Sequence, residues 1–178
     1  MKLIQDLREF IELLNSENVQ YLVIGGWAFN RYAEPRMTGD FDFFVSTSAQ
    51  NEAALRSVLA KFGFKKQLPP VKRSLFLKKV LMLGLPPNRI DIISEIDGVS
   101  FAEAWPARES GLLDGLPVWF ISRKHLMQNK SAAARDKDLA DLKILKNMYQ
   151  GRKAVRKRAT KIHGRTRRVT KAKRAGCR

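Results

Sequence analysis

Two aspartates alternate with aromatic residues in the run Asp40-Phe41-Asp42-Phe43-Phe44-Val45. In a β-strand, side chains two residues apart project from the same face, so Asp40 and Asp42 would point together. Burying an ionised carboxylate among apolar side chains is costly unless a positive group lies nearby. The run therefore predicts a strand of a buried sheet on which two carboxylates face a common cation.

A third aspartate lies in a similar setting, in Ile90-Asp91-Ile92-Ile93. Three carboxylates on neighbouring strands suit octahedral magnesium, and a two-ion site would hold its ions about 3.5 to 4 Å apart. Two other interpretations stay open. Asp40 could be a turn or N-cap residue after Gly39, and Asp42 and Asp91 could form buried ion pairs with Arg36 or Arg89.

Gly25 and Gly26 follow the apolar run at residues 21–24 and precede a predicted helix at residues 27–32. Glycines between a strand and a helix let a phosphate approach the backbone N–H groups at the helix N-terminus. Taken alone, the pair is more typical of a tight turn, and its spacing to Asp40 is what favours the phosphate site.

The remaining hydrophobic pattern predicts one α/β (α+β) domain over residues 1–149, with a mixed, twisted β-sheet flanked by α-helices. A helix over residues 3–15 precedes the first strand. The other predicted elements are a strand at residues 41–45, a helix at 50–62, a hairpin of strands 75–83 and 89–94, a strand at 116–121, and helices at 122–134 and 138–149.

Composition sets the compartment that we expect. The chain has 178 residues, 44% of them hydrophobic, and a single cysteine, so an intrachain disulfide is excluded. No apolar stretch approaches the roughly 18 residues that span a bilayer, and charge interrupts the N-terminal segment too early for a signal peptide. We expect a soluble, cytoplasmic protein with no membrane partner.

The C-terminal segment, residues 150–178, is predicted to be a disordered basic tail. It contains 13 of the 34 Lys and Arg residues and no acidic residue. Such a tail favours a nucleic-acid partner, bound through phosphate neutralisation without sequence preference and weakened by salt. The alternative is a solvated extension without a dedicated partner.

Together these residues resemble the minimal nucleotidyltransferase pattern of the polymerase beta superfamily. That pattern is an apolar residue and two small residues, a spacer of about a dozen residues, and then Asp-apolar-Asp-apolar. Here it reads Ile24-Gly25-Gly26, thirteen intervening residues, and Asp40-Phe41-Asp42-Phe43. The third metal carboxylate of the family comes from a later strand, and Asp91 matches it. The resemblance implies a nucleotidyltransferase-like sheet.

Residues 1–149 also resemble small bacterial nucleotidyltransferases grouped with AbiEii-type toxins. The shared segments are Tyr21–Gly26, Pro35–Asp40, and Asn129-Lys130 leading to Lys137–Asp141. This resemblance implies that Lys130 and Asp141 hold the nucleotide or order the site, and that Arg36 and Thr38 reach its phosphates. Alternatively, Lys130 is a solvated helix residue, and the acidic residues Asp138 and Asp141 lie on the exposed first turn of the last helix.

The activity that the resemblance implies is transfer of a nucleoside monophosphate from an NTP to an acceptor, with release of pyrophosphate. Asp40 and Asp42 would bind two Mg²⁺ ions, and Asp91 would bind the catalytic ion and help deprotonate the acceptor. RNA, a protein hydroxyl or a small molecule could be the acceptor, and the activity could be toxin-like, with an antitoxin partner that one chain does not reveal. The competing hypothesis is a nucleic-acid-binding protein that keeps this fold without turnover.

Overall fold

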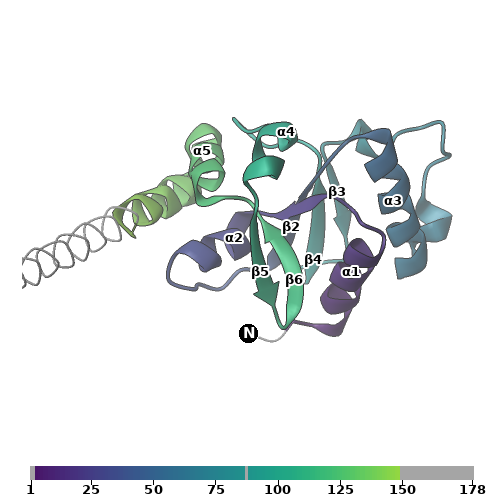
Figure 1. The fold of residues 1–178 in the computed structure, drawn as a ribbon, viewed down its shortest axis with the longest axis horizontal. Helices are drawn as coiled ribbons and strands as arrows, with labels where there is room; N and C mark the ends of the chain where they lie inside the picture. The colour runs from purple at the N-terminus through teal and green to yellow at the C-terminus, as the bar shows by residue number, and fades with distance from the viewer. Residues whose placement is uncertain (1–2, 87, 149–178) are drawn as a thin grey trace, which may run out of the picture.

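The two strands that carry the aspartates lie next to each other in a six-stranded mixed sheet of order β3-β4-β2-β1-β6-β5. The computed structural model describes residues 3–86 and 88–148. Helices cover both faces of the sheet (Figure 1). The elements are α1 (Gln5–Ser16), β1 (Tyr21–Val23), α2 (Gly25–Tyr32), β2 (Asp40–Val45), α3 (Ala49–Leu59), β3 (Val80–Leu83), β4 (Arg89–Ile93), α4 (Phe101–Ala104), β5 (Glu109–Leu113), β6 (Leu116–Phe120), α5 (Arg123–Ala133) and a helix at residues 136–148.

The sheet register places the acidic residues side by side. Strands β2 and β4 run parallel, with Asp40 opposite Arg89 and Asp42 opposite Asp91. Strand β1 is antiparallel to β2, so its C-terminal end delivers Gly25 to the end of the sheet at which β2 begins. The predicted α/β class with a mixed sheet flanked by helices is confirmed, and the alternation of acidic and aromatic residues does form a strand.

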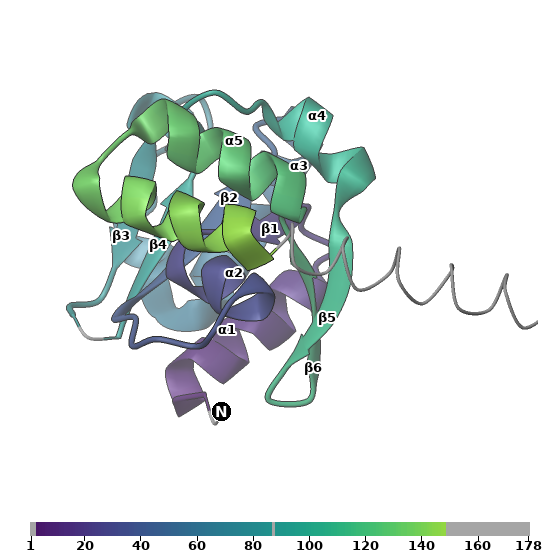
Figure 2. The same ribbon diagram turned by 90° about the vertical axis from the view of Figure 1, so that its left-hand side faces the viewer.

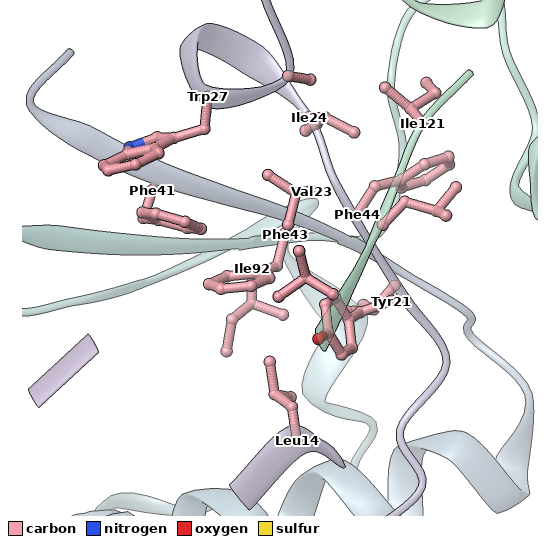
Figure 3. Packing of buried hydrophobic residues seen from close by; sticks show 14 of the residues in the cluster. Leu14, Tyr21, Val23, Ile24, Trp27, Phe41, Phe43, Phe44, Ile92 and Ile121 are labelled. Carbon is pink, nitrogen blue, oxygen red and sulfur yellow. The ribbon is translucent and has the colours of Figure 1, made fainter. Parts of the chain in front are cut away.

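The apolar face of β2 packs under α1. In α1 the buried residues recur at helical spacing and are Leu7, Phe10, Ile11 and Leu14. The rings of Phe10 and Phe43 lie 5.6 Å apart. Those of Tyr21 and Phe43, which Figure 3 labels, lie 5.5 Å apart. Phe41 and Phe43, which alternate with the aspartates, therefore anchor β2 in the core, and this leaves Asp40 and Asp42 on the opposite face of the sheet.

The opposite face is covered by α2, α5 and the helix at residues 136–148, and the last two lie side by side (Figure 2). Arg36, before β2, and Lys130, in α5, both bond to Asp141 of the helix at 136–148. No helix in the described part of the chain is long and apolar enough to cross a membrane. The predicted tail at residues 150–178 lies outside the described residues.

Two predictions about strands need correction. The first strand of the predicted hairpin is shorter than residues 75–83, because Leu75–Leu77 forms a 3-10 turn. In this turn the Ser74 side chain accepts a hydrogen bond from Phe76 N, and Leu75 N donates to Glu52. Strand β5, which pairs with β6 as a second hairpin, was not predicted.

Candidate active site

Most of the predicted site residues line one cavity of about 470 Å³ on the α5 side of the sheet. The sheet supplies its acidic floor, the start of α2 supplies the glycines, and α5 with the following turn supplies basic and acidic side chains. Of the predicted residues, those that line it are Gly25, Gly26, Arg36, Asp40, Asp42, Asp91 and Lys130. Thr38 and Asp141 lie just behind this lining and contact Gly26 and Arg36, respectively.

Asp42 is the least compensated of the three carboxylates. Its pKa is raised to about 6, first by burial and then by the charges of Asp91 and Asp40, against the opposing charges of Arg89 and Lys130. Within residues 3–86 and 88–148, no side chain donates a hydrogen bond to the Asp42 carboxylate, and none forms an ion pair with it. This carboxylate therefore stays in an environment that favours a positive ligand.

Arg89 neutralises the other two carboxylates. Its Nε and Nη2 donate to the two carboxylate oxygens of Asp91, each at 2.8 Å, and Nη2 also donates to Asp40 Oδ2 at 2.9 Å. The alternative of an ion pair with arginine is thus correct for Asp91 and extends to Asp40. It is wrong for Asp42, which forms no ion pair within residues 3–86 and 88–148.

Arg89 bonds to two of the three carboxylates that would hold the predicted magnesium ions. Among the described residues, no group of three or more His, Cys, Asp or Glu side chains is arranged to hold a metal ion. The donor set itself fits magnesium, because three carboxylates on adjacent strands face one cavity and one of them is uncompensated. The magnesium site stays a prediction, and Arg89 would compete with a metal ion for Asp40 and Asp91.

Gly25 and Gly26 are required because the side chains of Asp42 and Thr38 lie close to their backbone. Gly25 has φ +59°, and a Cβ there would overlap the carboxylate of Asp42, while a Cβ at Gly26 would overlap Thr38 Oγ1. Ile24, the N-cap of α2, makes no side-chain capping hydrogen bond, so the N–H groups of the first turn stay uncapped by it. The pair is thus both a turn and an open helix end beside Asp42.

Gly25→Ala is expected to lower the free energy of unfolding by about 2–4 kcal/mol, because it adds left-handed strain and overlap with Asp42. The matched control is Gly115→Ala in the β5–β6 turn, where φ is +82° and no atom lies within 4 Å of the added Cβ. Urea unfolding of both variants separates the two contributions. Equal losses would show that Asp42 yields to the methyl group without cost.

Lys130 belongs to a buried ionic cluster. Its Nζ donates to Asp138 Oδ1 at 2.9 Å and to Asp141 Oδ2 at 2.7 Å. Asp141 also accepts from Arg36 Nη2 at 2.8 Å, and Asp138 accepts from Arg135 Nε at 2.6 Å. The alternatives of a solvated Lys130 and of exposed acidic residues are wrong, since Lys130, Asp138 and Asp141 are all buried. Direct contacts of Lys130, Asp141, Arg36 and Thr38 with a nucleotide stay predictions.

Two contributors to the site were not singled out from the sequence. The sequence resemblance includes Asp138 only as part of the shared segment Lys137–Asp141, without a role of its own, and it does not include Arg135. Asp138 does share the spacing i, i+3, i+4, i+7 with Asp141, Leu142 and Leu145, all of which are buried. This spacing puts both acidic residues on the same helix face as Leu142 and Leu145, but hydrophobicity alone does not assign them to the interior.

Comparison with known proteins identifies the fold. No protein-family model and no curated protein matches the chain. The solution structure of the antibiotic-resistance factor ANT(2'')-Ia is similar, with a TM-score of 0.53, 14% identity, and coverage of 92% of this chain and 96% of that one. A crystal structure of ANT(2'')-Ia in complex with adenylyl-2''-tobramycin gives a TM-score of 0.51, 15% identity, and coverage of 86% and 96%.

A crystal structure of the lincosamide antibiotic adenylyltransferase LnuA, bound to lincomycin, gives a TM-score of 0.49, 16% identity, and coverage of 82% and 98%. Identities this low establish architecture alone, and the resemblance to the AbiEii-type group stays a prediction. From the sheet order and the similarity to ANT(2'')-Ia, the chain has a nucleotidyltransferase-like fold.

Proposed function

We propose that this protein transfers a nucleoside monophosphate from an NTP to an acceptor hydroxyl and releases pyrophosphate. The observation that carries the proposal is the juxtaposition of Asp42, which has no hydrogen-bonding partner among the described residues, with Asp40, Asp91 and an open glycine turn in one cavity. The fold shared with ANT(2'')-Ia, which was crystallised with an adenylylated antibiotic, supports it.

Each side of the cavity has a role in this reaction. The N–H groups at the start of α2 would donate to the triphosphate, which can come close because Gly25 and Gly26 have no side chains. Asp91, once released by Arg89, would accept the proton of the acceptor hydroxyl as its oxygen bonds to the α-phosphorus and the bond to pyrophosphate breaks. Magnesium held by Asp40, Asp42 and Asp91 would neutralise the phosphate charge.

The ionic cluster around Lys130 would keep the cavity in shape. Arg36 connects the segment between α2 and β2 to Asp141, and Lys130 connects α5 to the helix at residues 136–148. Arg36 and Lys130 both line the cavity. A bound triphosphate could therefore replace Asp141 as the acceptor of their hydrogen bonds. Most of the rate enhancement would then come from positioning and charge neutralisation.

The test is nucleotide transfer by the full-length protein with magnesium. The four α-labelled NTPs would be offered with RNA, protein and small-molecule acceptors, and label transfer and pyrophosphate release would be followed. We expect one acceptor class to become labelled and chelation by EDTA to stop the reaction. If no NTP is bound or consumed under any condition, the proposal fails. A nucleic-acid-binding protein without turnover then becomes the better interpretation. The neutralisation of Asp40 and Asp91 by Arg89 would agree with such a loss of catalysis.

Arg89→Met is expected to tighten Mn²⁺ binding to the nucleotide-free protein at least tenfold. The reason is that three charge-assisted hydrogen bonds, each worth about 1.5–3 kcal/mol, no longer compete for Asp40 and Asp91, and about 1.4 kcal/mol suffices for a tenfold change. Isothermal titration with Mn²⁺ measures the effect. The control is Arg36→Met. Arg36 lines the same cavity but bonds to Asp141, so we expect its removal to leave the Mn²⁺ affinity unchanged. Unchanged affinity in Arg89→Met would show that Arg89 does not restrict the metal site.

A further inference from the structure

The charge of the domain is strongly polarised along the sequence. Between residues 53 and 90 there is no Asp or Glu, and the nine basic residues there are Arg56, Lys61, Lys65, Lys66, Lys72, Arg73, Lys78, Lys79 and Arg89. The rest of residues 1–149 contains 12 basic and 17 acidic residues. A nearly balanced domain thus consists of a positive segment and a negative remainder.

Most of this positive charge lies in residues 60–79, which we call the basic loop. The loop is fastened to α3 by two largely buried side chains. Arg56 donates to the carbonyl oxygens of Pro69 at 2.8 Å and Arg73 at 2.5 Å, and Glu52 accepts from Ser74 Oγ at 2.7 Å and Leu75 N at 2.9 Å. These contacts give the loop a defined path, so its charges form a fixed surface.

The cations of the basic loop face outward. Glu17 pairs with Lys61, and Glu95 pairs with Lys79, at the two ends of the loop. Between these ends the exposed cations are Lys65, Lys66, Lys72, Arg73 and Lys78. None of these five pairs with a carboxylate of residues 3–86 or 88–148. Because these five like charges lack ion-pair partners in the described part of the chain, they would attract an external polyanion.

The loop leads directly to the candidate active site. It enters the edge strand β3, whose first residue, Val80, lines the cavity together with Glu95, the partner of Lys79. In Figure 1 the loop lies beside α3, and β3 connects it to the sheet. A chain of phosphates lying on the loop could therefore continue around the β3 edge to Asp91.

We infer that the basic loop binds the phosphodiester backbone of a nucleic-acid acceptor beside the cavity. The role as acceptor rests on the proposed transfer activity, whereas the binding does not. The phenylalanines of the loop, Phe62, Phe64 and Phe76, are half-buried and pack on the core, so the surface offers charge rather than exposed rings for stacking bases. Binding would therefore be strongly salt-dependent and indifferent to sequence.

A lipid surface fits the loop less well. Val71 and Leu77 are exposed beside the lysines. However, the longest helical element in the loop, Ala60–Phe64, has five residues and is interrupted at Gly63, whereas interfacial binding uses an extended amphipathic helix. Anionic vesicles therefore serve as the comparison ligand in the test, and we expect the basic loop not to bind them.

The test compares two full-length triple variants with the wild type. Lys65→Gln/Lys66→Gln/Lys72→Gln neutralises the loop. Lys124→Gln/Lys143→Gln/Lys146→Gln removes the same charge from exposed positions on α5 and the helix at 136–148. The probe is a fluorescein-labelled single-stranded RNA of about 20 nucleotides, titrated by anisotropy at several KCl concentrations. Each phosphate contact contributes about 0.7 to the slope of log Kd against log salt for a single strand. Loss of the three lysines of the loop should therefore lower this slope by about two, and the control should lower it clearly less.

Equal losses in the two variants would overturn the inference, because net charge alone would then explain them. It is also overturned if the loop variant keeps wild-type RNA affinity but loses binding to phosphatidylserine vesicles. With a labelled RNA acceptor, we further expect the loop variant to raise KM for RNA while kcat and NTP affinity stay unchanged. If the wild type transfers nothing, the proposed activity fails, and the binding comparison still decides the surface.

Discussion

Asp42→Asn is expected to lower kcat for nucleotide transfer at least 10³-fold and at the same time to make the metal-free protein more stable at pH 8. The loss of activity follows because Asp42 is the carboxylate left without a hydrogen-bonding partner among the described residues, so an amide there removes the charge that the transfer site needs. Labelled-NTP transfer measures kcat. A variant with near-normal transfer would remove Asp42 from the proposed mechanism.

The gain in stability has a defined sign. The pKa of Asp42 rises from 3.8 to about 6 on folding, through burial and then through the charges of Asp91 and Asp40. A carboxylate whose pKa rises on folding destabilises the protein fully above the folded pKa and not at all below the unfolded one. At 1.36 kcal/mol per pKa unit, Asp42→Asn should add about 3 kcal/mol at pH 8, and the gain should fade between about pH 6 and 4.

Urea unfolding in EDTA at pH 8 and at pH 4 measures this difference. Asp40→Asn is the control, since Asp40 accepts a hydrogen bond from Arg89 and its side chain is 37% exposed. That variant should not become more stable at pH 8. An Asp42→Asn protein less stable than the wild type at pH 8 would mean that the Asp42 carboxylate has a stabilising partner.

The acidic strand was predictable from sequence because its pattern has a period of two. Phe41 and Phe43 were expected to face the core, so Asp40 and Asp42 were expected to share the other face. In the structure, the register of β2 with β4 places Asp91 opposite Asp42. The pairing of Arg89 was harder to foresee. Arg89 and Asp91 are two residues apart on one strand, so a shared face was expected, but the reach to Asp40 depends on the alignment of two strands distant in the sequence.

The last helix shows where hydrophobic periodicity misleads. In the sequence, the helical spacing of Leu139, Leu142, Leu145 and Met148 predicts that these four residues form its buried edge. In the structure Leu139 is 47% exposed, and the buried stripe is Asp138, Asp141, Leu142 and Leu145. The helix is turned toward its acidic residues because Lys130 lies between them. A hydrophobicity pattern cannot represent this contact, since it counts charged residues as exposed.

The buried cluster makes a second large effect measurable. Lys130→Met is expected to lower the free energy of unfolding by about 3–5 kcal/mol at neutral pH, because Asp138 and Asp141 would stay buried with one cation fewer. Burial by itself raises the pKa of Asp138, and hydrogen bonds from Lys130 and Arg135 more than offset this and lower it. The stabilisation carried by Asp138 is therefore present at neutral pH and is lost in acid, as the pH falls through the lowered pKa.

The matched variant is Lys130→Met/Asp138→Asn/Asp141→Asn, which removes both buried carboxylates along with the lysine and should recover most of the lost stability in urea unfolding. Arg36 and Arg135 are left without carboxylate partners there but reach solvent, with side chains 29% and 77% exposed. If Lys130→Met instead keeps its stability and loses NTP affinity, Lys130 contacts phosphate, as the sequence resemblance implies. If it loses stability and the triple variant regains both stability and NTP binding, its main role is to hold α5 against the last helix.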